Sequence, residues 1–189
     1  MLISRNKAVF LDRDGTINVD KGYLYKACDF EFLPGATDAL KKLQNAGYLL
    51  IVITNQSGIG RGYYTEEDFE ALNEYMKSEL RKHGVNLAGV YYCPHLPDAK
   101  VERYRKVCTC RKPSLGLFER AVHDFNIDLS LSYAVGDKPR DCAICLKSEC
   151  RGFLINADSD DERIMRVTSL YEASEIITGG KECRTYETF

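Results

Sequence analysis

The stretch Lys7-Ala8-Val9-Phe10-Leu11-Asp12-Arg13-Asp14-Gly15-Thr16 decides the expected fold. Residues 7–11 form a short, largely apolar run with strand-favouring side chains, which predicts a buried strand. The run ends in two carboxylates, Asp12 and Asp14, followed by glycine and threonine. In an open α/β sheet ligands bind at the carboxyl ends of the strands, so these carboxylates stand where a cation binds and a nucleophile attacks. The pattern Asp-x-Asp-Gly is also common in turns, so the rest of the chain has to decide.

Length and composition set the class of protein. The chain has 189 residues and a formal net charge of −2, which suits one domain with its own core and gives no general attraction for nucleic acid or an anionic membrane. No apolar run approaches the ~20 residues of a membrane span, and residues 1–6 lack the apolar core of a secretory signal. We therefore expect a cytoplasmic monomer without nucleic-acid or membrane partners. In that reducing compartment, clustered cysteines favour metal binding over disulfides.

Strand-like and helix-like segments alternate along the whole chain. Further strands are expected at 48–53, 89–92, 131–135 and 152–155, and helices at 34–46, 65–84, from 114, from 141 to about 150, and at 168–177. This alternation predicts an α/β protein with a doubly wound parallel sheet. We expect a single domain over 1–189, with a short flap at about 16–33, a long polar loop at 93–110 and a loosely ordered tail at about 179–189.

Three of the predicted strands end in polar residues, namely Asp12 and Asp14, Thr54 and Asn55, and Asp137. Parallel strands bring these ends to one edge of the sheet. Asp12 and Asp137 offer the hard oxygen ligands that Mg²⁺ prefers, and one of the first two carboxylates can attack phosphorus. Thr54, Asn55 and Lys112 can hold the phosphoryl oxygens, whose charge must be stabilised during transfer. The pattern therefore indicates metal-assisted phosphoryl transfer.

The polar loop carries a second pattern, Cys93-Pro94-His95 followed after twelve residues by Cys108-Thr109-Cys110. Three sulfurs and one imidazole make a complete shell for structural Zn²⁺. The spacing departs from the usual C-x-x-C knuckle, and cysteines are often small buried residues, but a polar loop has little core in which to bury them. We expect a zinc-stabilised loop that positions Arg111 and Lys112 directly after it.

Four motifs resemble those of the haloacid dehalogenase-like phosphatases: 12–16, Thr54-Asn55, Lys112 and Gly136-Asp137-x-x-x-Asp141. Longer segments resemble the heptose bisphosphate phosphatases within that family, whose near relatives are the histidinol-phosphate phosphatases. These segments are 20–23, 54–62, 91–95, 108–113 and 136–138. The resemblance covers residues 7 to about 155. It implies a haloacid dehalogenase-like Rossmannoid fold without a large cap domain, open to a small soluble sugar bisphosphate.

The resemblance also implies a two-step hydrolysis of the 7-phosphate of a heptose 1,7-bisphosphate, feeding nucleotide-activated heptose and cell-surface polysaccharide. Asp12 would attack phosphorus, and Asp14 would protonate the leaving sugar oxygen and later deprotonate water. Mg²⁺ would be held by the Asp12 side chain, the Asp14 backbone carbonyl and Asp137. The environments of the two carboxyls should therefore differ, and the flap is the expected cause.

The implied catalytic residues are Asp12, Asp14, Thr54, Arg111 and Lys112. The implied substrate-binding residues are Asp20, Lys21, Gly22, Tyr23, Thr54, Asn55, Gln56, Ser57, Arg61, Arg111, Lys112 and Lys138. A sugar bisphosphate carries roughly four negative charges, so it needs cations beyond the metal. Arg61 is included as such a cation, although it is also compatible with an ordinary solvated loop residue.

One stretch departs from the family pattern. Cys142, Cys145 and Cys150 stand where the family has an alanine-rich run. These cysteines invite a second metal site, but their positions on a helix favour packing as small apolar side chains. The departure concerns the packing of that helix and leaves the chemistry untouched.

Three other functions compete with the heptose bisphosphate assignment. A histidinol-phosphate phosphatase shares the motifs, and polynucleotide 3′-phosphatases share the loop over 54–62. The balanced charge and the lack of a basic stripe or a kinase segment count against a nucleic-acid substrate. An inactive zinc-bearing interaction module is disfavoured because Asp12, Asp14, Lys112 and Asp137 are all intact.

Overall fold

The expected strands form one parallel sheet in the computed structural model, which describes residues 5–179. The strand order is β3-β2-β1-β4-β5-β6. The bounds are β1 Ala8–Leu11, β2 Leu49–Asn55, β3 Gly89–Cys93, β4 Tyr133–Gly136, β5 Arg151–Ile155 and β6 Ile164–Val167. Each neighbouring pair is parallel, and β1 lies between β2 and β4. The predicted doubly wound sheet is confirmed.

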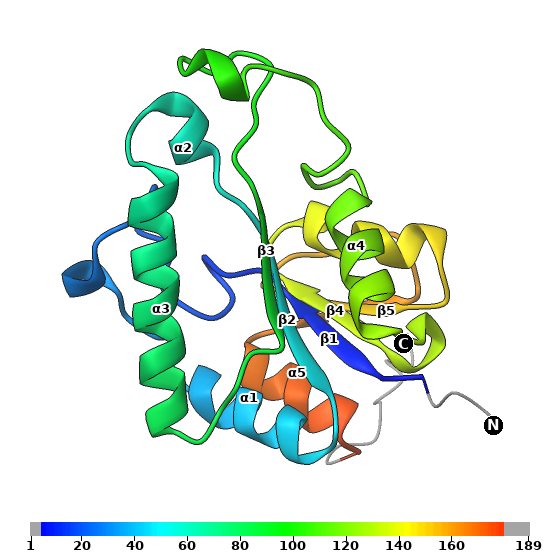
Figure 1. The fold of residues 1–189 in the computed structure, drawn as a ribbon. Coiled ribbons are helices and arrows are strands. Elements are labelled where there is room, and N and C mark those ends of the chain that lie inside the picture. Colours follow the sequence, from blue (N-terminus) through cyan, green and yellow to red (C-terminus); the bar gives the residue numbers. More distant parts are fainter. Residues whose placement is uncertain (1–4, 180–189) are drawn as a thin grey trace.

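Helices cover both faces of this sheet. They are α1 Ala36–Asn45, α2 Ser57–Arg61, α3 Glu66–Lys82, α4 Gly116–Phe125 and α5 Leu170–Ile177. Within β1, Val9 and Leu11 pack into the cluster that contains residues of α1, α3 and α5, whereas Ala8 and Phe10 pack into the cluster with residues of α4. Figure 1 shows the sheet running between α3 and α4. A strand buried on both faces explains why residues 8–11 are all apolar.

Two elements differ from the expectations. The edge strand β6 was not expected, because an arginine interrupts its apolar residues. In the structure it pairs with β5 at the edge of the sheet. The helix expected from 141 to about 150 is instead a 3₁₀ segment, Pro139–Lys147, with non-helical backbone at Cys142. The cysteine prediction is confirmed, since Cys142, Cys145 and Cys150 are fully buried in the cluster that packs on α4.

The flap is a loop held by a few backbone contacts. Asn18 forms a bridge with Phe32, and the Val19 amide donates to the Glu31 carbonyl at 2.9 Å. A single 3₁₀ turn, Ala27–Asp29, lies at its far end. The segment therefore contains no cap domain. The expected tail falls almost wholly outside the described residues.

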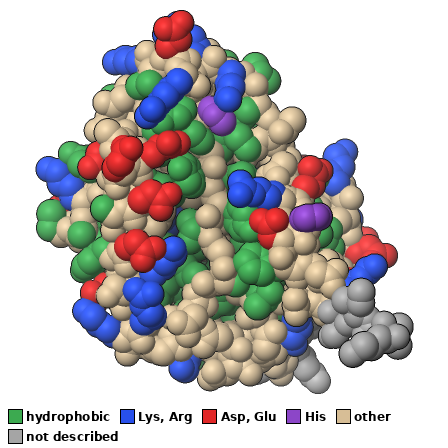
Figure 2. Space-filling model, viewed as in Figure 1, with side chains coloured by type: hydrophobic (Ala, Val, Ile, Leu, Met, Phe, Trp, Pro, Cys, Tyr) green, Lys and Arg blue, Asp and Glu red, His purple; other side chains and the backbone are tan. Residues whose placement is uncertain are grey.

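The charged surface is mixed in sign. On the face in Figure 2, acidic side chains gather along α3 and basic ones lie among and around them, with no continuous basic stripe. Within residues 5–179, no helix combines the length and the apolar character that crossing a bilayer requires.

Candidate active site

The carboxyl ends of β1, β2 and β4 surround one cavity. Asp12 follows β1, Thr54 and Asn55 end β2, and Asp137 follows β4; all four line a cavity of ≈ 340 Å³. They meet because β1 pairs with both β2 and β4 in parallel. The topology thus brings together residues that are more than a hundred positions apart in the sequence.

Asp12 and Lys112 form a buried ion pair at the base of the cavity. Lys112 is 2% exposed, and its Nζ lies 2.9 Å from Asp12 Oδ1 and 2.6 Å from Asp141 Oδ1. Nζ also donates to the Ile53 carbonyl at 2.6 Å. Burial raises the pKa of Asp12 to about 6, although Lys112 acts in the opposite direction. Burial opposes the charge on Lys112, but the two carboxylates outweigh it and hold the Lys112 pKa above its usual value.

Asn55 fixes the backbone that carries this lysine. The Asn55 side chain donates to the Lys112 carbonyl at 3.1 Å and accepts from the Lys112 amide at 3.0 Å. This pair of bonds ties the segment before α4 to the end of β2. Asn55 thereby positions Lys112 as well as lining the cavity.

Asp14 accepts hydrogen bonds from three side chains. Arg13, which is fully buried, donates to both Asp14 oxygens at 2.8 to 3.2 Å. Asn18 Nδ2 donates to Oδ1 at 2.9 Å, and Gln56 Nε2 donates to Oδ2 at 3.1 Å. The surroundings of Asp14 therefore differ from those of Asp12. Part of that difference comes from Asn18, which belongs to the flap, in line with the expectation.

The Gln56 side chain connects four other side chains in a buried hydrogen-bond network. It is 2% exposed, and its Nε2 donates to Thr54 Oγ1 at 2.9 Å as well as to Asp14. Its Oε1 accepts from the Tyr64 hydroxyl at 2.5 Å and from Arg13 Nη2 at 3.4 Å. Thr54 is 1% exposed, so Thr54 and Gln56 both line the cavity with side chains that are almost fully buried.

Asp137 closes the other side of the cavity. Its Oδ2 pairs with Lys138 Nζ at 2.9 Å. Gly15 packs directly on this carboxylate, because a Cβ at Gly15 would lie 2.6 Å from Asp137 Oδ2. Side-chain oxygens of Asp12, Asp137 and Asp141 lie within 4.8 Å of one another. This donor set suits a hard divalent cation.

The flap contributes a third wall. Asp20, Gly22 and Tyr23 line the cavity. Asp20 Oδ1 accepts from the Gly22 amide at 2.9 Å, and Gly22 and Tyr23 both have positive φ, 65° and 50°. The Tyr23 ring meets the Tyr63 ring edge-on with centroids 4.7 Å apart. A left-handed tyrosine costs free energy, and this ring contact offsets part of it.

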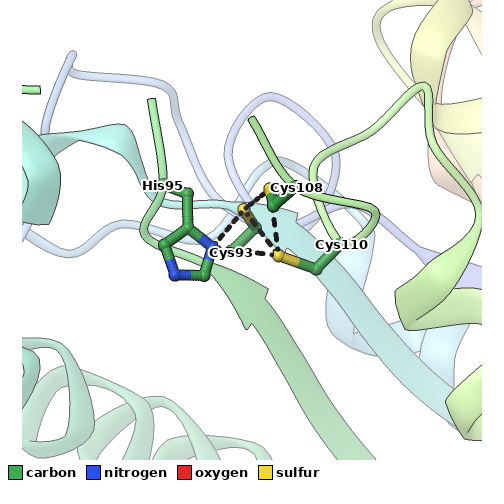
Figure 3. A group of neighbouring side chains, drawn as sticks. All are labelled: Cys93, His95, Cys108 and Cys110. Atoms are coloured by element: carbon green, nitrogen blue, oxygen red, sulfur yellow. Dashed lines mark hydrogen bonds between the residues drawn. The ribbon is translucent and has the colours of Figure 1, made fainter. Parts of the chain in front are cut away.

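The polar loop folds its four expected ligands together (Figure 3). Cys93 comes from the end of β3, and the ligand atoms of Cys93, His95, Cys108 and Cys110 lie within 4.8 Å of one another. Cys110 Sγ lies 3.1 Å from both His95 Nδ1 and Cys93 Sγ. Burial lowers the pKa of His95, helped by Lys106, which favours the neutral imidazole that metals bind. The cluster has the donor set of a closed zinc shell.

Comparison with known proteins gives the family. A family model described as polynucleotide kinase 3 phosphatase matches residues 7–146. A D-glycero-beta-D-manno-heptose-1,7-bisphosphate 7-phosphatase of Haemophilus ducreyi is 54% identical over 136 residues, which cover 71% of this chain and 74% of its own. The protein of the same name from Photorhabdus laumondii is 41% identical over 182 residues, covering 93% and 97%. The chain belongs to the family of the heptose-1,7-bisphosphate 7-phosphatases.

Solved structures agree with this membership. A D,D-heptose 1,7-bisphosphate phosphatase from B. bronchiseptica, complexed with magnesium and phosphate, matches with a TM-score of 0.81 and 27% identity, over 93% of this chain and 99% of its own. A putative haloacid dehalogenase-like phosphatase of Mesorhizobium loti matches with a TM-score of 0.83 and 29% identity, over 95% and 90%. The resemblance found in the sequence motifs is confirmed.

Some expected site residues of this chain lie away from the cavity. Lys21 pairs with Glu31 at 3.1 Å and does not line it. Arg61 and Arg111 are half-buried and also lie outside its lining. Arg61 belongs to α2, which packs closely on the zinc loop: a Cβ at Gly60 would lie 2.6 Å from a loop carbonyl. Ser57, by contrast, does line the cavity, as does Lys138.

Sequence reasoning missed four residues in or beside the cavity: Tyr64 and Arg140 line it, and Arg13 and Asp141 bond to residues that line it. Asp141 was part of a quoted motif without a role. The sequence signal for Asp141 was its place three residues after Lys138, which is the spacing of a capping box. In the structure its Oδ2 accepts from the Lys138 amide at 2.9 Å, and its Oδ1 pairs with Lys112. Arg140 had a weaker signal, a second cation next to a strand-end aspartate.

Proposed function

We propose that this protein hydrolyses the 7-phosphate of D-glycero-D-manno-heptose 1,7-bisphosphate, giving heptose 1-phosphate for the synthesis of nucleotide-activated heptose and cell-surface polysaccharide. The observation that carries the proposal is the buried Asp12–Lys112 pair, 2.9 Å apart, at the base of a cavity that Asp14 and Asp137 also line. The identity of the substrate is inferred from the names of the relatives.

In the first step an Asp12 carboxylate oxygen forms a bond to phosphorus. The bond from phosphorus to the sugar O7 breaks, and its electron pair goes to O7, which takes a proton from Asp14. Lys112 holds Asp12 in place and offsets negative charge at the base of the cavity. Thr54 and Asn55, at the end of β2, support the transferring oxygens.

In the second step water adds to the phosphorus of the aspartyl phosphate. Asp14 takes a proton from that water, and the bond between phosphorus and Asp12 breaks to restore the carboxylate. All the hydrogen bonds to the Asp14 side chain come from donors on Arg13, Asn18 and Gln56. Asp14 must therefore exchange one of these donors for the sugar oxygen when substrate binds.

Magnesium fits the carboxylate side of the cavity. Asp141 is already paired with Lys112 at 2.6 Å, so we assign the ion to the side chains of Asp12 and Asp137 and the backbone carbonyl of Asp14. Bound there, Mg²⁺ supplies positive charge that stabilises the phosphoryl oxygens. The close approach of Gly15 to Asp137 supports this assignment, because any larger residue would push the carboxylate aside.

Zinc fits the cysteine and histidine cluster of the loop. Four protein ligands leave no open position, so the proposed role is structural. A zinc site made of thiolates is also consistent with a cytoplasmic location, where cysteines stay reduced. We further propose that the protein acts as a monomer, because the large exposed apolar side chains are mostly single tyrosines and leucines on different elements.

A 3′-phosphorylated nucleic acid is the second candidate substrate, because the matching family model carries that name. The mixed charge on the face in Figure 2 counts against it. Nucleic-acid binding draws most of its affinity from clustered Lys and Arg.

A substrate panel tests the proposal. Phosphate release would be measured with heptose 1,7-bisphosphate, histidinol phosphate and a 3′-phosphorylated oligonucleotide. We expect kcat/KM for the heptose bisphosphate to exceed both others by at least about a hundredfold. A higher kcat/KM for histidinol phosphate or for the oligonucleotide would overturn the substrate assignment.

A further inference from the structure

Arg13 is a buried cation that stands between Asp12 and Asp14 in the sequence. Both of its neighbours line the cavity, but Arg13 itself does not, and its side chain is fully buried. A buried charge is costly unless it is paired and hydrogen-bonded. The partners of this guanidinium therefore indicate what it does in the protein.

The guanidinium binds the Asp14 carboxyl group through one edge. Nε and Nη2 both donate to the Asp14 oxygens, and the shortest contact is 2.8 Å, between Nη2 and Oδ2. A fork of two donors fits a carboxylate in one orientation, so Arg13 fixes the plane of that carboxyl group. The Phe69 ring of α3 packs on the guanidinium, with its centroid 5.4 Å from Cζ, and this contact helps to hold the fork in place.

The same guanidinium also binds the flap. Arg13 Nη2 donates to the Leu24 carbonyl at 3.3 Å, and Leu24 is buried. Leu24 directly follows Tyr23, which is part of the flap wall of the cavity. One side chain therefore ties the flap to the acid–base group Asp14.

Of the three residues that donate to Asp14, Gln56 is the one that a substrate can replace. Gln56 lines the cavity, and its Nε2 also donates to Thr54 Oγ1 at 2.9 Å, so it keeps a partner when it leaves Asp14. Arg13 and Asn18 are fully buried and do not line the cavity. The sugar oxygen can therefore take the place of Gln56 at Asp14 Oδ2 while Arg13 keeps its contacts.

We propose that Arg13 is a positioning residue that directs the Asp14 carboxyl group toward the leaving sugar oxygen and holds the flap beside it. The inference rests on the proposed function and deepens it, because it assigns a residue that acts on proton transfer through Asp14. Arg13 itself does not touch the substrate. Its loss should slow the steps in which Asp14 moves a proton and spare the attack of Asp12 on phosphorus.

The test compares the first turnover of two substrates on the same variant, by rapid quenching at saturating substrate. The sugar oxygen of heptose 1,7-bisphosphate takes a proton from Asp14 as it leaves, whereas an aryl phosphate releases a phenolate that needs none. Arg13→Lys keeps the charge but loses the fork. We expect its first-turnover rate constant for the bisphosphate to fall about ten- to a hundredfold, because small misplacements of catalytic groups are costly. The rate constant for the aryl phosphate should stay within about twofold of the wild-type value, because that reaction does not use Asp14 in its first step.

A second variant and a matched control complete the design. Arg13→Gln, which keeps hydrogen-bond donors but no charge, should show the same contrast between the two substrates. Arg163→Lys is the control, because Arg163 binds Asp161 through the same kind of fork, with distances of 2.9 and 2.6 Å, but is exposed and does not line the cavity. It should leave both rate constants at wild-type values.

Two results would overturn the inference. One is an equal loss on both substrates in the Arg13 variants, which would make Arg13 a support of the fold alone. The other is an unchanged rate constant for the bisphosphate. A first-turnover rate constant does not depend on the folded fraction of the enzyme, so the comparison also holds for a less stable variant. Both results leave turnover by the wild-type protein intact, whereas its failure to release phosphate from the bisphosphate would overturn the proposed function together with the inference.

Discussion

At the residue scale, the site depends on charges that are buried in opposite pairs. Lys112 lies between Asp12 and Asp141, and each of the three is at most 8% exposed. Removing one partner of a buried pair typically costs about 3–5 kcal/mol, since a charge is left without compensation. The raised pKa of Asp12, about 6, reflects the same burial. Asp12 stays predominantly ionised above that pH, as a nucleophile and a metal ligand must.

The hydroxyl of Tyr64 is predicted to position the acid–base group. It donates to Gln56 Oε1 at 2.5 Å, and Gln56 in turn donates to Asp14 and Thr54. Tyr64→Phe removes one buried hydrogen bond, worth about 1 kcal/mol, and frees the Gln56 amide to rotate. We expect kcat to fall about fivefold with little change in KM, measured by steady-state phosphate release.

Tyr25→Phe is the control for this variant. The Tyr25 ring stacks on Tyr64 with centroids 5.5 Å apart, and its hydroxyl makes no hydrogen bond in the described part of the chain. It should keep the wild-type kcat. The positioning role is wrong if Tyr64→Phe keeps the wild-type kcat, or if both variants lose the same amount.

The residue types of the site were predictable, but their directions were not. Asp12, Asp14, Thr54, Asn55 and Asp137 could be placed because each follows a recognisable apolar strand. Arg13 and Gln56 could not be predicted as buried partners of Asp14. Both lie just beyond the end of a strand, where the alternation of side chains along the strand no longer predicts which way a side chain points. That direction is set by contacts with residues far away in sequence.

At the element scale, the zinc loop is linked to the site through packing. Its residues Leu96, Ala99 and Tyr104 share a buried cluster with Ile59 of α2 and with Tyr64. Its other end leads directly into Lys112, which Asn55 holds. A shift of the loop would therefore disturb both the lysine and the Tyr64–Gln56 network. A metal bound by the four ligands of the loop would therefore act on catalysis by holding the loop in place.

Loss of the metal should weaken catalysis without unfolding the sheet. Cys108→Ser removes one of four ligands, so we expect no bound zinc and a kcat lower by about ten- to a hundredfold, because small misplacements of catalytic groups are costly. Cys28→Ser, which changes an exposed cysteine outside the cluster, should keep both. Metal content by mass spectrometry, circular dichroism and kcat would be measured on each. A zinc-free Cys108→Ser with wild-type kcat would refute the linkage.

Elements with a continuous apolar run or a clear helical repeat were predictable, and elements with an interrupted pattern were not. The helix α3 begins as expected at a Thr65 cap, where Thr65 and Asp68 bond reciprocally. The strand β6 escaped prediction because an arginine interrupts its apolar residues, and α2 did because two of its five residues are glycines and it has no helical repeat. Their boundaries are set by neighbours: β6 by pairing with β5, and α2 by packing on the zinc loop.

At the scale of the whole molecule, function follows from strand order. The alternation of elements predicted a parallel sheet, but only the structure gives the order that places β1 between β2 and β4. Successive strands extend the sheet to one side from β1 to β3 and to the other side from β4 to β6. Ligands bind at such a switch point in open α/β sheets. Asp12 therefore stands where loops from both halves of the sheet converge on a cavity.

The central claim is that Asp12 becomes phosphorylated during turnover. Asp14→Asn removes the group that activates water, so the second step should be blocked. An aryl phosphate, whose leaving group needs no proton, should still react in the first step and release one phenolate per enzyme in a burst. Rapid quenching and peptide mass spectrometry would then locate the phosphoryl group. The account predicts it on Asp12; its presence on any other residue, or steady release without a burst, would contradict the account.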